Sequence, residues 1–164
     1  MRQTAYDVAA LVARIVLGVV LLAHGLQKAT VGMGRTIDGF EEMGVPLPPV
    51  SAAFAMIVEI GAGVLLILGL FTPLAGVLVL VNMLGAFLFV HREAGVFVRE
   101  GGWELVAMIG LLGLLLAAGG AGRYSLDHVL FGRRGGFGFG RRHSTAPHTV
   151  APPLDLPRRD NSGG

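Results

Sequence analysis

The chain has 164 residues, of which 53% are hydrophobic and 15% charged, and its formal net charge is +2. Soluble domains carry about 25% charged residues, so this composition excludes an ordinary water-soluble protein and predicts an integral membrane protein. The sequence has no cysteine, which excludes disulfides, thiolate nucleophiles and cysteine-ligated iron–sulfur sites on this chain. We expect one membrane domain, residues 1–130, followed by a tail, residues 131–164.

The first expected span covers residues 4–26, and from Val8 to Leu26 its one charge is Arg14. An apolar run after Arg2 is also typical of a signal peptide, but Arg14 interrupts it and no small-x-small cleavage site follows. We therefore expect a retained span. At 3.6 residues per turn, two cations and two glycines share one face, which we expect to pack against other helices. The residues of this face are Arg14, Gly18, Leu21, Gly25 and Lys28.

The connection from residue 27 to residue 49 contains an amphipathic pattern. Met33, Ile37 and Phe40 recur at helical spacing, with acidic residues on the opposite side, and Gly44 marks a stop. This pattern predicts a short helix at the membrane surface. An irregular loop remains the alternative.

The second expected span covers residues 51–70, and its one charge is Glu59. Small residues share the face of Glu59, as is typical of packed membrane helices. These are Ala52, Ala55 and Gly63. The turn that follows is so short that spans two and three form an antiparallel hairpin, with Thr72 as the expected N-cap of the third span and Pro73 at its first helical position.

The third expected span, residues 74–90, is uncharged, and Asn82 with Gly85 and Ala86 marks its expected packing face. The fourth, residues 103–118, has Glu104 in its first turn. Ser125 is placed to cap a short helix after this span. The fold class is therefore an all-α, integral membrane four-helix bundle with an interfacial helix in the first long loop.

The tail beyond residue 131 is rich in Arg, Gly and Pro, and we expect it to be disordered. Seven of the thirteen Lys and Arg residues lie from Arg123 onward, so the positive-inside rule predicts both termini in the cytoplasm of a plasma-membrane protein. The same basic residues favour binding of the tail to anionic lipid. The segment GRRGGFGFGRRH also resembles Arg-Gly-rich RNA-binding tails, but we favour lipid over nucleic acid.

Charged residues within the spans require partners. Counted along the helices, Arg14 and Glu59 lie at nearly the same depth, and an unpaired charge at the bilayer centre costs at least about 2.5 kcal/mol. We therefore predict a buried ion pair between Arg14 and Glu59. Five residues form the candidate site for protons or a polar ligand: His24, Lys28, Glu59, Asn82 and Glu104.

The role of these polar residues stays open between a purely structural network and a ligand or proton site. A metal centre is disfavoured, because the carboxylates and the histidine lack a Glu-x-x-His motif on one helix. Haem is disfavoured because it needs an axial pair, and His24 is the one histidine inside a span.

Four segments follow one another along the chain: ARIVLGVVLLAHGLQK, FEEMGVP, VEIGAGVLLILGLFTP and WELVAMIGLLGLLLAAGGAGRYSLD. Their order and spacing resemble those of the DoxX family of small four-helix membrane proteins. The resemblance covers about residues 8–130. Many members have an arginine after the threonine of the hairpin turn, where this chain has Pro73, so a role for that cation is not carried over. The matching positions are Arg14, Gly18, His24, Gly25, Lys28, Phe40, Gly44, Pro46, Glu59, Gly69, Thr72, Glu104, Gly122, Ser125 and Asp127.

The resemblance implies a membrane subunit of a redox or oxidative-stress-protection assembly, since the family is linked to a thiosulfate:quinone oxidoreductase subunit and to a complex with a superoxide dismutase and a sulfurtransferase. It implies soluble redox partners, and our own hypothesis adds a quinone pocket between the helices near His24, Glu59 and Glu104. Two other functions remain open, a carrier for a small solute or lipid and a structural scaffold. Whether the chain is an enzyme, and whether it forms a homo-oligomer, also stay open.

Overall fold

A computed structural model describes residues 2–132 as helices joined by short connections, with no strand in that range. This confirms the predicted all-α fold. The expected tail, residues 131–164, lies outside the described residues except for its first two. The helices are α1 (Arg2–Val31), α2 (Met33–Glu42), α3 (Pro48–Leu68), α4 (Thr72–Ala86), the π-helical turn η1 (Phe87–His91), the 3-10 turn η2 (Val98–Glu100), α5 (Glu104–Gly119) and α6 (Leu126–Phe131).

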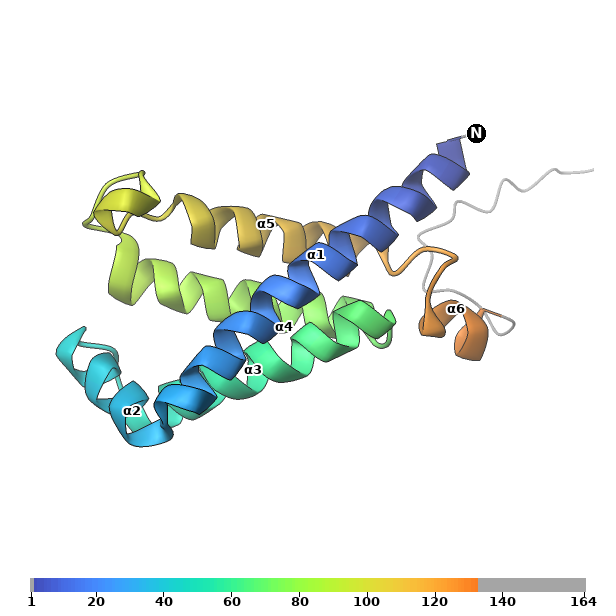
Figure 1. Ribbon diagram of the computed structural model, residues 1–164. Helices are drawn as coiled ribbons and strands as arrows, with labels where there is room; N and C mark the ends of the chain where they lie inside the picture. Colours follow the sequence, from blue (N-terminus) through green and yellow to red (C-terminus); the bar gives the residue numbers. More distant parts are fainter. Residues whose placement is uncertain (1, 133–164) are drawn as a thin grey trace, which may run out of the picture.

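Three of these helices are long and apolar enough to cross a membrane: α1, α3, and α4 continued by η1 to His91. α5 is equally apolar but has 16 residues, which correspond to about 24 Å of helix. It occupies the region where we expected the fourth span. The long helices lie side by side, with α2 at one end and α6 and the N-terminus at the other (Figure 1).

Two helix pairs are packed through facing glycines. A Cβ added at Gly18 of α1 would lie 2.7 Å from the carbonyl oxygen of Gly63 in α3. A Cβ added at Gly76 of α4 would lie 2.4 Å from the carbonyl oxygen of Gly113 in α5. Both distances are shorter than van der Waals contact, so glycine is needed for the backbones to approach this closely. The α1–α3 and α4–α5 pairs are thus the tightly packed units of the fold.

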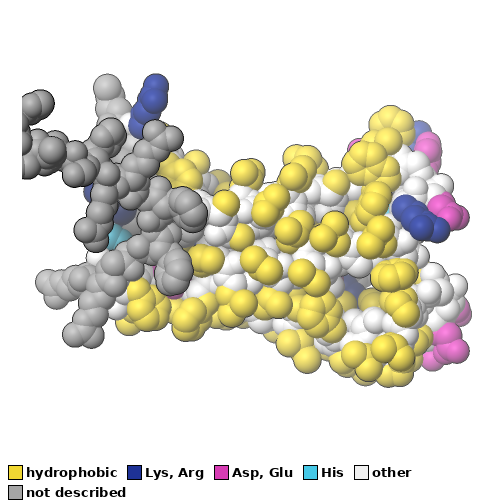
Figure 2. Space-filling view, turned by 180° about the vertical axis from the view of Figure 1, so that it is seen from behind, with side chains coloured by type: hydrophobic (Ala, Val, Ile, Leu, Met, Phe, Trp, Pro, Cys, Tyr) yellow, Lys and Arg dark blue, Asp and Glu magenta, His cyan; other side chains and the backbone are white. Residues whose placement is uncertain are grey.

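The core between these pairs is made of aliphatic side chains, the most buried of which are Leu17, Leu21, Leu66, Ala75 and Val79. Large apolar side chains also cover the outside, with Ile57 70% and Leu115 66% exposed. Figure 2 shows this apolar surface between the two ends and charged side chains gathered at the end away from the grey segment. An apolar outer surface is what a bilayer-embedded bundle requires.

The interfacial helix expected in the first connection is present as α2. A glycine with positive φ lies on each side of it, Gly32 at 97° and Gly44 at 71°, which lets the chain turn sharply into and out of the helix. The short helix after Ser125 is present as α6. The hydroxyl of Ser125 accepts a hydrogen bond from the His128 backbone N–H at 3.2 Å, as expected of an N-cap.

Candidate functional site

The register of α1 against α3 decides which polar residues meet. The two helices run antiparallel, with Gly18 opposite Gly63 and Gly25 opposite Glu59. Arg14 lies 11 residues before Gly25, about 16 Å along the helix axis. The predicted Arg14–Glu59 ion pair is therefore wrong, because depths counted from the expected span starts ignored this offset between the helices.

Arg14 instead binds two backbone carbonyls, while its buried Nε–H has no hydrogen-bond partner within residues 2–132. Its side chain is fully buried, and its guanidinium donates hydrogen bonds to the carbonyl oxygen of Leu66, at 3.2 Å, and to that of Tyr124. Gly69, in the turn after α3, has a φ of 67°, and a Cβ there would overlap the guanidinium. Arg14 thus joins α1, the end of α3 and the segment after α5.

A second contact at this end of the molecule caps α4. The Asp127 carboxylate accepts hydrogen bonds from the backbone N–H groups of Phe71 and Thr72, at 2.8 and 3.0 Å. The Asp127 N–H in turn donates to the Gly69 carbonyl at 2.9 Å. The expectation that Thr72 is the N-cap is wrong, since Phe71 takes that position and Thr72 is the first helical residue, with its hydroxyl buried and unpaired. A carboxylate 55 residues away does the capping.

Asp7 is another residue that sequence reasoning missed. It is buried at the start of α1, accepts a hydrogen bond from the Arg123 N–H at 3.1 Å, and lies 3.8 Å from the Arg123 side chain. Asp7 lies near the beginning of the expected first span. Nothing in the sequence around it indicates that its partner is Arg123, a residue after the last span.

At the opposite end of the bundle, Lys28 of α1 and Glu59 of α3 form an ion pair. The ammonium nitrogen lies 2.8 and 2.6 Å from the two carboxylate oxygens. The Glu59 side chain is 8% exposed and that of Lys28 is 24% exposed. Glu59 thus receives the partner that its depth in the membrane demands, and the partner is the second cation of the α1 face.

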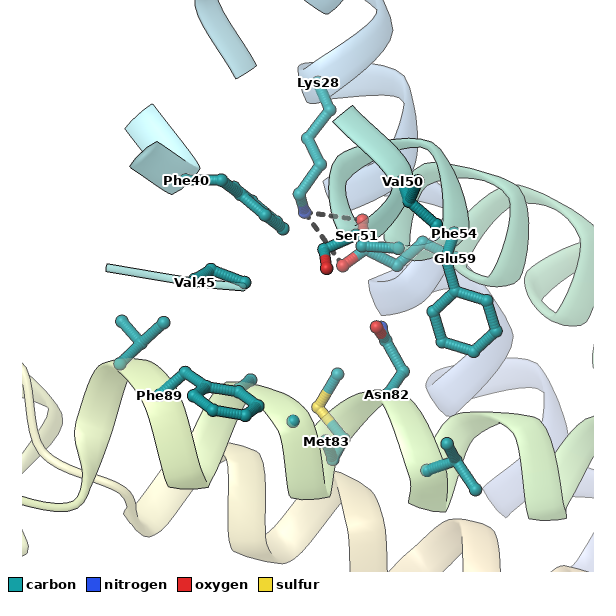
Figure 3. A pocket seen from close by; sticks show the side chains of 15 residues that line it. Lys28, Phe40, Val45, Val50, Ser51, Phe54, Glu59, Asn82, Met83 and Phe89 are labelled. Carbon is teal, nitrogen blue, oxygen red and sulfur yellow. Dashed lines mark hydrogen bonds and ion pairs between the residues drawn. The ribbon is translucent and has the colours of Figure 1, made fainter. Parts of the chain in front are cut away.

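This ion pair forms one wall of a cavity of about 290 Å³ between α1, α2, α3 and α4. Phe40 and Val45 approach it from α2 and the segment after it, and Phe54 and Phe89 from α3 and η1 (Figure 3). Asn82 extends from α4 into the cavity toward Glu59. Within residues 2–132 the Asn82 side chain has no hydrogen-bond partner, although the residue is only 9% exposed. The cavity therefore combines apolar walls with a neutralised charge pair and an unused amide.

Gly85 and Ala86 also line this cavity, rather than forming the packing face of the third span that we expected. A Cβ added at Gly85 would meet no atom within 4 Å. The contact of α4 with α5 is made through Gly76 instead, which lies nine residues before Gly85 and therefore on the opposite side of the helix.

The structure brings together three of the five candidate site residues, namely Lys28, Glu59 and Asn82. His24 is exposed and does not line the cavity, because it precedes Gly25 by one residue and is turned about 100° from the packed face. Glu104 accepts a hydrogen bond from the Val98 N–H at 2.7 Å and so orders the connection between α4 and α5. Neither residue contributes to the site with Glu59.

The long apolar helices, the polar residues buried between them and the apolar outer surface define a small multi-span membrane protein. The DoxX family model matches residues 9–92, which include the ion pair and Asn82. The chain belongs to the DoxX family.

Several relatives extend over most of the chain. An uncharacterized membrane protein of Mycobacterium tuberculosis is 35% identical over 71% of this chain and 78% of its own length. The inner membrane protein YphA of Escherichia coli is 31% identical over 71% of this chain and 86% of its own. The Bacillus subtilis protein named "Putative oxidoreductase CatD" is 31% identical over 80% of this chain and 94% of its own. No solved structure matches.

Proposed function

We propose that the cavity beside Lys28 and Glu59 binds the polar head of a quinone, and that this chain is the membrane subunit of a redox assembly. The observation that supports this most is the Asn82 amide, which has no partner in the described part of the chain and lies in an apolar cavity beside a neutralised ion pair. A quinone head is a flat apolar ring with two carbonyl acceptors. It matches an amide donor, an ammonium group and aromatic walls, and it brings no net charge to a site that is already neutral.

The chemistry of a bound quinone defines what the protein must supply. Conversion of a quinone to a quinol takes up two electrons and two protons. Glu59 and Lys28 lie where a proton would be exchanged with a bound head, while the chain contains no cysteine to supply electrons. The electrons would come from a redox partner protein. The name of the relative CatD, which describes an oxidoreductase, favours this class of function.

Asn82→Leu tests the binding site with little risk to the fold, because the amide has no hydrogen-bond partner among residues 2–132. Membranes containing the protein would be extracted in mild detergent, and bound quinone would be quantified per mole of purified protein. We expect a loss of about tenfold in Asn82→Leu, the upper effect of one neutral hydrogen bond, and no loss in Gln27→Leu, an exposed amide on α1.

Wild-type protein that carries no more quinone than an unrelated membrane protein would overturn the proposal, as would Asn82→Leu protein that carries the wild-type amount. Crosslinking before extraction should capture the soluble redox partner. Uptake of a solute into proteoliposomes that depends on Glu59 and on pH would instead support a carrier.

We propose further that both termini lie in the cytoplasm, which places the cavity near the outer surface, since it lies at the end of the bundle away from α6. The basic residues from Arg123 onward support this orientation. A reporter that is active only in the cytoplasm should work when fused after Gly164. Glu93→Cys would be the single cysteine of the chain and should react with a membrane-impermeant reagent from outside. An inactive reporter and an unreactive cysteine would show that the protein has the opposite orientation in the membrane.

A further inference from the structure

The cavity beside Lys28 and Glu59 opens sideways, between α3 and α4, at a part of the surface that faces the bilayer. From this geometry we infer that its ligand enters from within the membrane, as an amphiphile whose head occupies the cavity and whose hydrocarbon chain stays in the lipid. This inference rests on the proposed function and adds the route and the chemical form of the ligand.

The exposure of the residues that line the cavity locates its mouth. Val50 and Phe54 of α3 are 63% and 39% exposed, and Val81 of α4 and Phe89 of η1 are 49% and 47% exposed. All four also line the cavity, so they form its rim. Val81 and Phe89 belong to a helix that is apolar enough to span the membrane. Val50 and Phe54 belong to α3, which is apolar enough as well. The rim is therefore bordered by hydrocarbon rather than by water.

Protein closes the cavity where α1 meets α3 and where the segment after α2 passes its end. Gly25 brings α1 against α3 so closely that an added Cβ would lie 2.6 Å from the Ile60 side chain. Val45, after α2, is 9% exposed and closes the end of the bundle together with Phe40. Figure 2 shows the open side, where a basic side chain lies at the bottom of a hollow among hydrophobic side chains. Lys28 is the basic residue that lines the cavity.

The size of the cavity indicates which part of the ligand it can hold. A volume of about 290 Å³ is at the lower limit of pockets that enclose a whole small ligand. It accommodates a ring and its substituents but not an isoprenoid chain of tens of carbon atoms. An apolar mouth removes the need to enclose the chain, because the chain loses no hydrophobic solvation when it remains in the lipid. A lipid-soluble quinone satisfies both requirements.

Gly85 provides a way to obstruct the mouth without disturbing the helices. It lines the cavity, and a side chain there would enter open space, so Gly85→Trp should obstruct the opening. Gly61 of α3 is the matched control. A Cβ at Gly61 also meets no atom within 4 Å, and Gly61 does not line the cavity. Both substitutions replace glycine within a helix by a residue with higher helix propensity, so neither should weaken the helix itself.

The experiment uses the full-length protein in lipid vesicles and a quinone that carries a photoreactive azido group on its ring and a long isoprenoid chain. Labelled peptides would be mapped by mass spectrometry after a short exposure. We expect saturable labelling of the segments around Lys28, Glu59 and Asn82 in the wild type and in Gly61→Trp, and at least tenfold less in Gly85→Trp. Unlabelled quinone should compete, and phospholipid should not.

A second measurement tests the mouth itself. Trp103 is the only tryptophan, so Gly85→Trp in a Trp103→Phe background gives a single fluorophore at the rim. Lipids brominated on their acyl chains should quench it strongly, and an aqueous quencher should have little effect. The reverse result would overturn the lateral opening.

The quinone site and the lateral route into it can be disproved separately. Wild-type labelling that Asn82→Leu abolishes and Gly85→Trp leaves unchanged would overturn the lateral route and keep the quinone site. Wild-type protein without saturable labelling would overturn both. Competition by phospholipid at the same positions would show that the cavity binds a lipid head rather than a quinone, and the lateral route would still hold.

Discussion

Arg14 and Lys28 lie on the same face of α1, about 21 Å apart along the helix axis, and their surroundings differ. Arg14 is fully buried, donates hydrogen bonds to two carbonyl oxygens of its own chain and does not line the cavity. Lys28 is paired with Glu59 at the wall of a cavity into which Asn82 also extends. The difference between the two cations is that Lys28 lies at a cavity that a ligand can enter, whereas Arg14 is enclosed by protein.

Arg14→Leu should produce the largest loss of stability. The substitution removes two charge-assisted hydrogen bonds and leaves the Tyr124 carbonyl without its donor, which should cost about 3 kcal/mol. Unfolding of the purified protein in detergent by a chemical denaturant would measure it. Bound quinone, counted per folded molecule, should stay unchanged, and a selective loss of quinone would show that the two polar regions are not independent.

Glu59→Leu should cause the second largest loss of stability and the largest loss of quinone binding. It leaves the Lys28 ammonium without a counter-charge in a partly buried site, at a cost of about 2 kcal/mol. Lys28→Met should cost a similar amount, and the double variant should be less destabilised than the sum of the two. A double-mutant cycle on unfolding free energies checks this, with strictly additive losses arguing against the pair.

Asp127→Ala should cost about 1 kcal/mol, the usual value of a helix cap. Asp38→Ala, which removes an exposed carboxylate on α2, is the matched control and should have almost no effect. Thermal unfolding of both variants in the same detergent would measure the difference. Equal midpoints would mean that the turn before α4 does not depend on the Asp127 carboxylate.

His24→Ala should have the smallest effect on either property. Its side chain is exposed and lies outside the cavity. The unfolding free energy should change by less than about 0.5 kcal/mol, as for most surface substitutions, and quinone binding should be unaffected. A loss of binding in this variant would require His24 to reach the ligand from outside the cavity.

The sequence predicted the features that depend on local periodicity. The face of α1 with two cations and two glycines is the packed face, and the face of α3 with Glu59 and Gly63 is buried against it. The short helix in the first connection and the Ser125 cap follow from composition and capping chemistry, which are also local. These features need no knowledge of where two helices cross.

The features that depend on the relative position of distant segments were not predictable in this way. Helical spacing places Arg14 and Lys28 on one face but does not say which of them lies opposite Glu59, because that depends on how far α1 slides along α3. The pairing of Gly18 with Gly63 fixes the register, and using the closest-packed glycines as the reference would have predicted Lys28. Asp127 could not be placed, since nothing near it in the sequence needs its carboxylate.

The contacts made by Tyr124 and Asp127 also impose an order on the assembly of the protein during synthesis. Arg14 emerges from the ribosome more than a hundred residues before Tyr124, and the turn before α4 emerges more than fifty residues before Asp127. The first three long helices must therefore enter the membrane with a guanidinium and two backbone N–H groups that still lack their final acceptors. These contacts form only when the segment after α5 has been made, so a nascent chain that stops before residue 124 lacks them.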